Sequence, residues 1–255
     1  MFADSHRVHN LASGSRRRRR LLLEQQTGLT AAVHTRPERE EPASPPGHSG
    51  EPSQGVLLIR DMLEDVAPRT WLFAGDTLDF DARKFQRCWT EFFSDSIKVE
   101  LQRSLDVVLD TAVRDSLIST LRRNLDWRIL RFHPDVVFLM PGPRESVAGE
   151  SGRRRFGLDL KKTVERLEEE GIVVALCTPP QIPGSGSRFD DLPAYVDLVR
   201  QVAGETDALL IDHWQHWMQL ESRTMLLDAN QVRPNFSGHQ QLAGHLWNTI
   251  GIGNG

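Results

Sequence analysis

The sequence has few cysteines and no long apolar run. Its 255 residues include two cysteines, Cys88 and Cys177, which are too few for a disulfide scaffold or a four-ligand zinc site of their own. They fit a reducing compartment, so we expect a cytoplasmic protein whose thiols are buried as small hydrophobic groups. No apolar run approaches the roughly 18 residues that a membrane-spanning helix needs. The sequence therefore predicts a globular protein without a transmembrane segment.

Neither sign of charge dominates the chain. It has 31 basic and 35 acidic residues, of which residues 1–55 hold 8 and 6, so the remainder holds 23 and 29 and has a net charge of −6. An acidic globular part is a poor electrostatic match for nucleic acid, and we do not expect it to bind any. The consecutive arginines Arg16 to Arg20 could still touch nucleic acid or an anionic membrane, although a solvated basic tail is the simpler interpretation.

Residues 1–55 read neither as a folded domain nor as a signal peptide. The arginine run is followed by three leucines only, whereas a secretory signal needs about 7–15 apolar residues. Residues 41–55 include ten prolines, glycines and serines, and such a segment buries too little apolar surface to offset its ordering entropy. We predict a disordered segment over residues 1–55 and one folded domain over residues 56–255.

The folded part alternates short apolar runs with longer amphipathic stretches. The apolar runs are predicted as strands over residues 70–74, 106–109, 135–140, 172–177 and 208–211. The amphipathic stretches are predicted as helices over residues 84–101, 116–132, 158–170, 192–202 and 238–250. Nearly continuous apolar strands between helices are typical of a parallel sheet covered on both faces. The sequence thus predicts a three-layer α/β/α sandwich with a five-stranded parallel sheet, whose ligands bind at the carboxyl ends of the strands.

Three loops at this edge carry motifs. Gly75-Asp76-Thr77 follows the first strand, Gly142-Pro143-Arg144-Glu145 follows the third, and the stretch from Asn230 to His239 precedes the last helix. Together they resemble the SGNH/GDSL hydrolases, a family of esterases, lipases and carbohydrate acyl-hydrolases. That family has Gly-Asp-Ser, a glycine after the second strand, Gly-x-Asn-Asp, and Asp-x-x-His-Pro-Asn-x-x-Gly-His in the same order. The resemblance spans about residues 71–250 and implies the flavodoxin-like SGNH-hydrolase fold.

The resemblance implies acyl transfer without a cofactor. In the family a serine attacks the ester, a histidine takes its proton and an aspartate orients the histidine, while two backbone amides and an asparagine bind the oxyanion. This chain departs from the family at each of these chemical positions. Thr77 replaces the serine, Ala112 the glycine, Arg144 the asparagine, Asn230 the aspartate and Arg233 the histidine.

The replacements remove the chemistry and keep the residues that shape the motifs. The Thr77 hydroxyl can be a nucleophile, but its methyl group crowds the attack and it still needs a base. Arg233 cannot be that base, because the pKa of arginine exceeds about 12. The residues with a role in turns and helix starts are retained: Gly75, Asp76, Gly142, Pro234, Asn235, Gly238 and His239. The chemistry of the replaced residues therefore predicts a pseudoenzyme.

Other histidines could supply a base or a metal ligand. Asp212, His213 and His216 follow the fifth strand, and an aspartate beside two histidines can bind a metal ion or act as a relocated base. The alternative is that Asp212 caps a helix and both histidines pack or are solvated. His239 is expected to pack in the first turn of the last helix. The spacing predicts no metal site.

The two arginines suggest an anion site. Arg144 and Arg233 both lie at the predicted carboxyl edge, near Asp76 and Thr77, and paired guanidinium groups suit a carboxylate, a phosphate or a sulfate. The alternative is internal pairing, of Arg144 with Glu145 or of Arg233 with Asp76 or Asp228.

Three functions remain open. The first is a pseudo-esterase that binds a small molecule, either an anion or an ester or carbohydrate. The second is an atypical ester hydrolase that uses Thr77 and an unidentified base. The third is a nucleic-acid or membrane adaptor driven by the arginine run. The acidic folded part counts against the third and the missing base against the second, so the first is the prediction.

Overall fold

The computed structural model describes residues 53–78, 87–182, 189–228 and 233–251. The chain divides into two units, Met1–Glu51 and Pro52–Gly255, and every described residue lies in the second. Most of the segment predicted to be disordered is therefore outside the described residues. The first described helix, α2 (Gln54–Glu64), begins two residues before the predicted domain boundary at residue 56.

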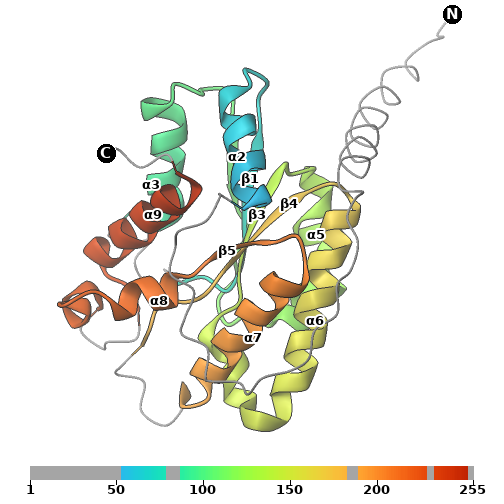
Figure 1. Ribbon diagram of the computed structural model, residues 1–255, viewed down its shortest axis with the longest axis vertical. Helices are drawn as coiled ribbons and strands as arrows, with labels where there is room; N and C mark the ends of the chain where they lie inside the picture. The colour runs from blue at the N-terminus through green and yellow to red at the C-terminus, as the bar shows by residue number, and fades with distance from the viewer. Residues whose placement is uncertain (1–52, 79–86, 183–188, 229–232, 252–255) are drawn as a thin grey trace, which may run out of the picture. The chain divides into compact units, whose positions relative to one another are not determined.

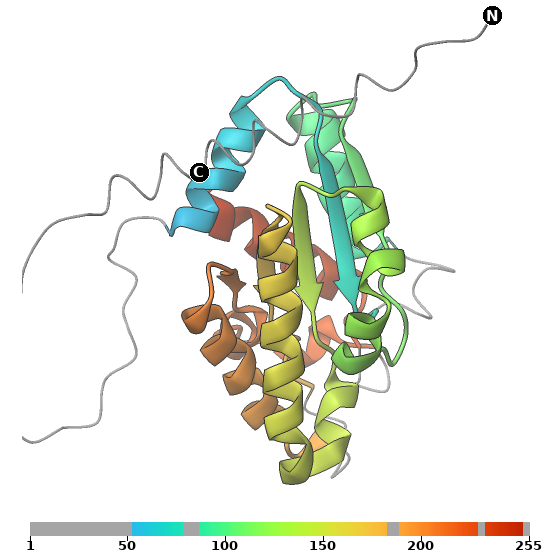
Figure 2. The same cartoon turned by 90° about the vertical axis from the view of Figure 1, so that its right-hand side faces the viewer.

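A five-stranded parallel sheet forms the centre of the second unit (Figure 1). Its strands are β1 (Thr70–Gly75), β2 (Val107–Asp110), β3 (Val136–Met140), β4 (Val173–Cys177) and β5 (Leu209–Ile211). They lie in the order β2-β1-β3-β4-β5, and each neighbouring pair is parallel. All five predicted strands are confirmed. Because the strands are parallel, their carboxyl ends lie at one edge of the sheet, as the arrows of β1 and β3 show in Figure 2.

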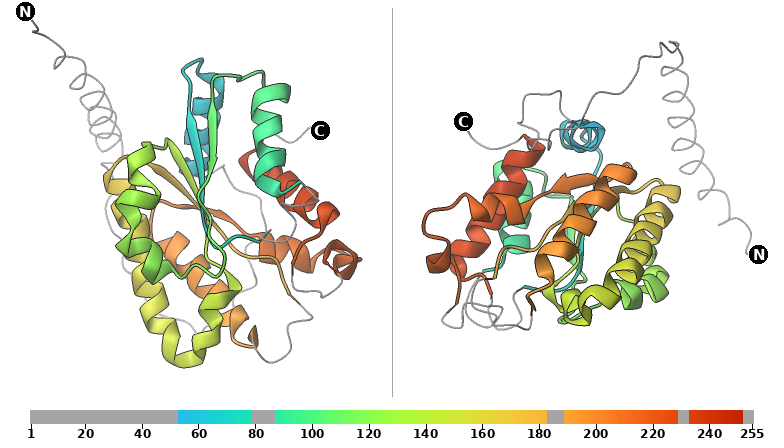
Figure 3. Two further views of the ribbon diagram at one scale, coloured as in Figure 1. Left: turned by 180° about the vertical axis from the view of Figure 1, so that it is seen from behind. Right: turned by 60° about the horizontal axis from the view of Figure 1, so that its bottom comes forward.

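Helices cover both faces of the sheet. Helices α2, α3 (Trp89–Asp95) and α9 (Phe236–Ile250) pack on one face, with α8 (His213–Met218) and a short 3-10 helix, η6 (Arg223–Leu226), before α9. On the other face lie α4 (Ile118–Arg123), α5 (Leu125–Arg128), η3 (Leu130–Phe132), η4 (Pro143–Ala148), α6 (Gly149–Glu169) and α7 (Leu192–Glu205). Figure 3 shows α3 (green) and α9 (red) on the side of the sheet away from α6 (yellow-green). The predicted α/β/α sandwich is confirmed.

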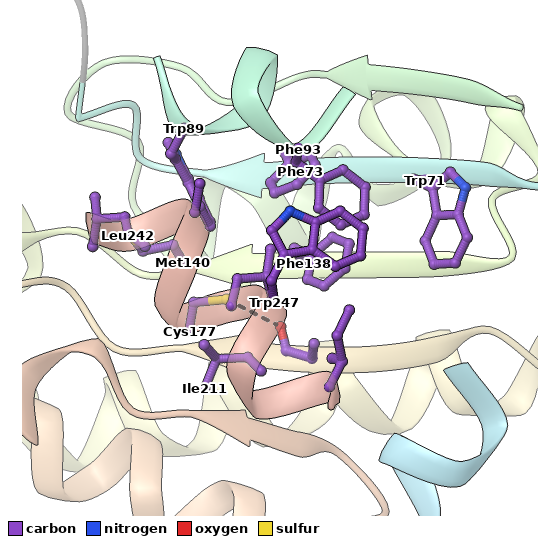
Figure 4. Packing of buried hydrophobic residues seen from close by; sticks show 14 of the residues in the cluster. Trp71, Phe73, Trp89, Phe93, Phe138, Met140, Cys177, Ile211, Leu242 and Trp247 are labelled. Carbon is purple, nitrogen blue, oxygen red and sulfur yellow. Dashed lines mark hydrogen bonds between the residues drawn. The ribbon is translucent and has the colours of Figure 1, made fainter. Parts of the chain in front are cut away.

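Alternation along each strand divides the core into two clusters. Trp71 and Phe73 of β1 face the α3 and α9 side, whereas Leu72 faces α4 and α6. On the first side Phe73 stacks on Phe138, with ring centroids 4.7 Å apart (Figure 4). Aromatic rings bury large areas and prefer such offset or edge contacts. The aromatic residues of this cluster therefore fix how α3 and α9 sit on the sheet.

Two predicted helices differ from those observed. The helix predicted over residues 84–101 begins at Trp89, because the Cys88 amide is bound by the Glu91 carboxylate at 2.8 Å. It ends in a π-helical turn, η2 (Ser96–Glu100). The helix predicted over residues 116–132 is broken into α4, α5 and η3. The Asn124 side chain donates to the Thr120 carbonyl at 2.9 Å and takes the place of a backbone donor at the first break.

The other helical predictions are confirmed in position, with one large difference in length. Helix α6 begins nine residues before its predicted start. Gly152 allows this extension, because a Cβ atom there would lie 2.3 Å from the Tyr195 hydroxyl oxygen of α7. Helices α2 and α8 were not predicted as elements. In α2, Val56 and Ile59 are buried at helical spacing, and the proline-rich stretch before them hid this signal.

Candidate functional site

The ends of β1 and β3 lie side by side at the carboxyl edge of the sheet. Gly75 is in register with Met140, and the Asp76 amide donates to the Met140 carbonyl at 3.0 Å. Gly75 has φ +109°, and a Cβ atom there would lie 2.1 Å from the Met140 carbonyl oxygen. Only glycine permits this approach. The motifs that follow the first and the third strand are thereby brought together.

Asp76 is a buried carboxyl at the junction of these motifs. Its Oδ1 accepts a hydrogen bond from the Asp115 amide at 2.8 Å, and a Cβ atom on Gly142 would lie 1.9 Å from its Oδ2. Burial raises the pKa of Asp76 to about 7, and the negative charge of Asp115 adds to the rise. The backbone amides of Asp115 and Thr77 and the guanidinium of Arg233 lower that pKa in part. Asp76 is therefore partly protonated near neutral pH.

Glu145 is a second buried carboxyl in the same place. It stands where the family pattern has the aspartate of Gly-x-Asn-Asp, and its Oε1 accepts from the Ile118 amide at the start of α4. Burial raises the pKa of Glu145 to about 7, and the charges of Asp76 and Asp159 contribute to the rise. Neither Asp76 nor Glu145 has an ion pair among the described residues. Asp76 and Glu145 both lie in the motifs found in the sequence, but the sequence does not show that their carboxyls are buried near each other.

The backbone amides at the family's oxyanion positions lie near carboxyl groups of the chain. The Thr77 amide is close enough to the Asp76 carboxyl to lower its pKa slightly. The Ala112 amide donates to Asp110 Oδ1 at 2.9 Å. The Thr90 hydroxyl of α3 approaches the other oxygen of Asp110 at 3.4 Å. An amide that already donates to a carboxylate is poorly available to a developing oxyanion.

Arg144 occupies the first turn of η4, directly after β3. Its side chain is half-buried and has no hydrogen bond or ion pair in the described part of the chain. The predicted alternative, pairing with Glu145, does not occur, since Glu145 binds the Ile118 amide instead. The side chain thus has its five N–H donors available at the carboxyl edge of the sheet.

Arg233 lies on the loop between η6 and α9. Its carbonyl accepts from the Asp228 amide at 2.7 Å, and Leu227 forms an antiparallel bridge with Pro234. Its guanidinium is near enough to Asp76 to lower the pKa of that carboxyl. The structure therefore brings Arg233 to the same edge as Asp76 and Thr77. Asn230, the remaining predicted position, is outside the described residues.

The retained motif residues hold this loop on α9. Asn235 caps the helix, with Oδ1 accepting from the Gly238 amide at 3.0 Å. Its Nδ2 donates to the carbonyls of Met225 at 2.7 Å and Leu227 at 2.9 Å. His239 is fully buried in the first turn, as predicted. These contacts position the backbone that carries Arg233.

The histidines after β5 form a packed cluster. Asp212 caps α8 by accepting from the Gln215 amide at 3.0 Å, which confirms the capping interpretation. His213 is fully buried, and its Nδ1 lies 3.0 Å from Nδ1 of His245 on α9. His216 stacks on His245 with ring centroids 4.2 Å apart. No group of metal-binding side chains occurs in the described part of the chain.

Burial keeps these histidines neutral. It lowers the pKa of His213 well below its usual value and that of His245 to about 4, and the neighbouring histidines act in the same direction. A buried neutral histidine bonded to another histidine is poorly placed to take a proton from a threonine. The sequence did not point to His245, which belongs to none of the motifs and approaches His213 only through the packing of α8 on α9.

The sheet order and the Gly-Asp-Thr turn after β1 define an SGNH-type α/β fold. A model of the GDSL-like lipase/acylhydrolase family matches residues 74–241. The chain belongs to this family. None of the curated proteins matches it in sequence.

Solved structures share the fold at low sequence identity. The acetyl xylan esterase AlAXEase is 19% identical, with a TM-score of 0.61 over 71% of this chain and 99% of its own. The acetylxylan esterase Axe2 of Geobacillus stearothermophilus is 18% identical, with a TM-score of 0.61 over 72% and 94%. LAE5, an alpha/beta hydrolase from the metagenome of Lake Arreo, Spain, is 17% identical, with a TM-score of 0.61 over 76% and 100%. Within the described residues, no helix is both long and apolar enough to cross a membrane.

Proposed function

We propose that this chain is a GDSL-family protein with impaired ester-hydrolase chemistry that binds a small molecule through an anionic group. The ligand would lie at the carboxyl edge of the sheet, against Thr77, Arg144 and Arg233. A carboxylate, a phosphate or a sulfate group suits guanidinium donors. Some solved structures with this fold are acetyl xylan esterases. We therefore include an acidic sugar, or an ester that carries a carboxylate, among the candidate ligands.

The missing proton acceptor supports impaired catalysis. Arg233 stays protonated at every physiological pH. Asp76 is adjacent to Thr77 and has a pKa of about 7, which suits a general base. Its carboxyl is, however, enclosed, because Gly142 covers one oxygen and the Asp115 amide binds the other. His213 and His239 are fully buried.

The amide of Ala112 supports the same conclusion. It already hydrogen-bonds the Asp110 carboxyl, whereas an oxyanion hole needs donors directed at the reacting atom. Binding of a stable anion makes no such demand, because side-chain guanidinium groups can adjust to it.

Arg144 is the observation that carries the binding proposal. A half-buried guanidinium with no protein partner in the described part of the chain keeps its charge and donors for a ligand. An arginine used for folding would instead have a carboxylate or carbonyl partner, as Arg103 and Arg200 have here.

Sulfate binding tests the proposal. We expect calorimetry at low ionic strength to detect sulfate binding that weakens as salt is added, since the attraction is partly screened. Arg144→Gln should weaken binding about tenfold or more, the scale of a lost charge-assisted hydrogen bond. Arg154→Gln is the matched control, because Arg154 is exposed on α6. Equal binding by both variants, or none by the unaltered protein, would show that the arginines are structural.

A further inference from the structure

Two buried acids, Asp76 and Glu145, adjoin residues of the proposed anion site. Asp76 is 8% and Glu145 9% exposed. Asp76 adjoins Thr77 in sequence, and Glu145 adjoins Arg144. Gly142 lies against Asp76 and begins the turn that leads to Glu145. Thr77 and Arg144, two of the residues that would touch the ligand, therefore each have a buried acid next to them in the sequence.

The two carboxyls hold the same loop. Asp76 accepts from the Asp115 amide at 2.8 Å, and Glu145 accepts from the Ile118 amide. The loop between β2 and α4 is thus tied at two points to the ends of β1 and β3. A protonated carboxyl can keep such a bond through its carbonyl oxygen. The structure is therefore compatible with the neutral and the ionised form of either group.

The charges around the pair oppose ionisation of both. Asp76 is influenced by the negative charges of Asp115 and Glu145, and by Arg233 as its neighbouring cation. Glu145 is influenced by Asp76 and by Asp159 of α6, and it also raises the pKa of Tyr195 on α7. With both acids ionised, their two negative charges offset the two positive charges of Arg144 and Arg233. With both protonated, these two acids no longer offset the positive charges of Arg144 and Arg233.

We propose that Asp76 and Glu145 make anion binding at this site proton-linked, so that the pair takes up a proton as the anion binds. The inference rests on the proposed anion site and adds a regulation to it. An anion beside two buried carboxyls favours their neutral forms, and by reciprocity their neutral forms favour the anion. Burial raises the pKa of both groups to about 7, which places the linkage near neutral pH. Affinity should therefore fall as the pH rises.

The test is calorimetric titration with sulfate from about pH 6 to about pH 8, across the pH range in which these groups titrate. Sulfate keeps one charge state over this range, whereas phosphate would titrate itself. Repeating each titration in buffers with different ionisation enthalpies gives the number of protons bound. We expect about half a proton to be taken up as sulfate binds. The affinity should then fall about tenfold over the two pH units, because the slope of log affinity against pH equals the number of protons taken up.

Glu145→Gln separates this linkage from ordinary pH effects. The glutamine keeps an acceptor for the Ile118 amide and removes the charge, so it should bind sulfate more tightly at high pH and lose much of the proton uptake. Asp76→Asn is a second variant with the same expected result, and near-UV circular dichroism checks the fold of each. Glu150→Gln is the matched control, because Glu150 is an exposed acid in the first turn of α6.

Two results would overturn the proposal and differ in meaning. Sulfate binding without proton uptake, with an equal pH dependence in Glu145→Gln and Glu150→Gln, would remove the linkage and leave the anion site. Absence of sulfate binding at every pH, in the variants as well as the unaltered protein, would remove the site and the linkage together.

Discussion

At the scale of single residues, the candidate site depends on how closely Asp76 and Gly142 pack. Gly142 has extended backbone angles, φ −91° and ψ 172°, which any residue can adopt. Its glycine is needed for space, because a Cβ atom would lie 1.9 Å from Asp76 Oδ2 and 2.2 Å from Asp76 Cβ. The buried carboxyl and the turn after β3 are therefore fitted to each other.

We expect Gly142→Ala to lower the free energy of unfolding by about 1–3 kcal/mol, the usual cost of overpacking a tight interior. Gly244→Ala is the control, since Gly244 lies within α9 and a Cβ atom there meets nothing within 4 Å. That change should raise stability by up to about 1 kcal/mol, because alanine favours helix over glycine. Urea unfolding measures both, and equal effects of the two changes would contradict the packing argument.

At this scale, the sequence predicts which residues come together better than it predicts which side chains are buried. It identified Thr77, Arg144 and Arg233 as one group, because two of their motifs follow parallel strands and the third has the same place in the family pattern, and the structure brings all three to the same edge. It did not identify the buried pair of carboxyls. The enclosure of Asp76 and Glu145 depends on the β2–α4 loop folding over them, and no residue pattern in that loop reports such a contact.

At the scale of elements, α8 and α9 are joined by neutral histidines. His213 and His245 share a hydrogen bond of 3.0 Å between their Nδ1 atoms, so one ring donates and the other accepts. Protonation of both rings would break this bond and place two charges in the interface. Because α9 follows the loop with Arg233, the packing of α8 on α9 also steadies one side of the candidate site.

Acid should therefore weaken the fold through these histidines. Burial lowers the pKa of His213 and His245, so the unfolded chain binds protons below about pH 6.5 that the folded chain excludes. Stability from this source is lost as the pH falls from about 6.5 towards the folded pKa of about 4 for His245. Asp76 and Glu145 act in the opposite direction, because their raised pKa lets the folded chain hold more protons. The net dependence of the free energy of unfolding on pH is thus the difference between the histidine effect and the carboxyl effect.

A variant isolates the histidine effect. His245→Gln should be less stable than the unaltered protein at neutral pH, by about 1 kcal/mol for a lost hydrogen bond, and the deficit should shrink as the pH falls. Denaturant midpoints at several pH values measure it. His133→Gln, in an exposed position, provides the control. A deficit that stays constant with pH would mean that the cluster does not titrate on unfolding.

Strand positions were easier to predict than helix ends. β1, β3 and β4 are short apolar runs that are mostly buried on both faces, and their limits follow from composition, whereas β2 lies at the edge of the sheet and is partly exposed. The limits of α3, α4 and α6 instead depend on a glutamate bonded to the Cys88 amide, an asparagine bonded to Thr120 and a glycine under Tyr195. These are local or tertiary contacts that helical periodicity does not contain.

At the scale of the whole molecule, the parallel sheet assembles the site. It brings the ends of β1 and β3 together in register, and Arg233 lies near enough to Asp76 to influence the pKa of that carboxyl. The GDSL-family architecture is thus retained, and we propose that the residues it carries at this edge no longer perform the family's acid–base steps. Because the folded part has a net charge of −6, the proposed anion site would depend on its local arginines and on the protonation of Asp76 and Glu145.

The central claim is that this architecture no longer hydrolyses esters. The most direct measurement compares hydrolysis of a short activated ester, p-nitrophenyl acetate, by the unaltered protein and by Thr77→Ala. The account predicts equal rates, because Arg233 cannot accept a proton and the Asp76 carboxyl beside Thr77 is enclosed. A rate well above that of Thr77→Ala would contradict it and show that Thr77 is the nucleophile of a working esterase.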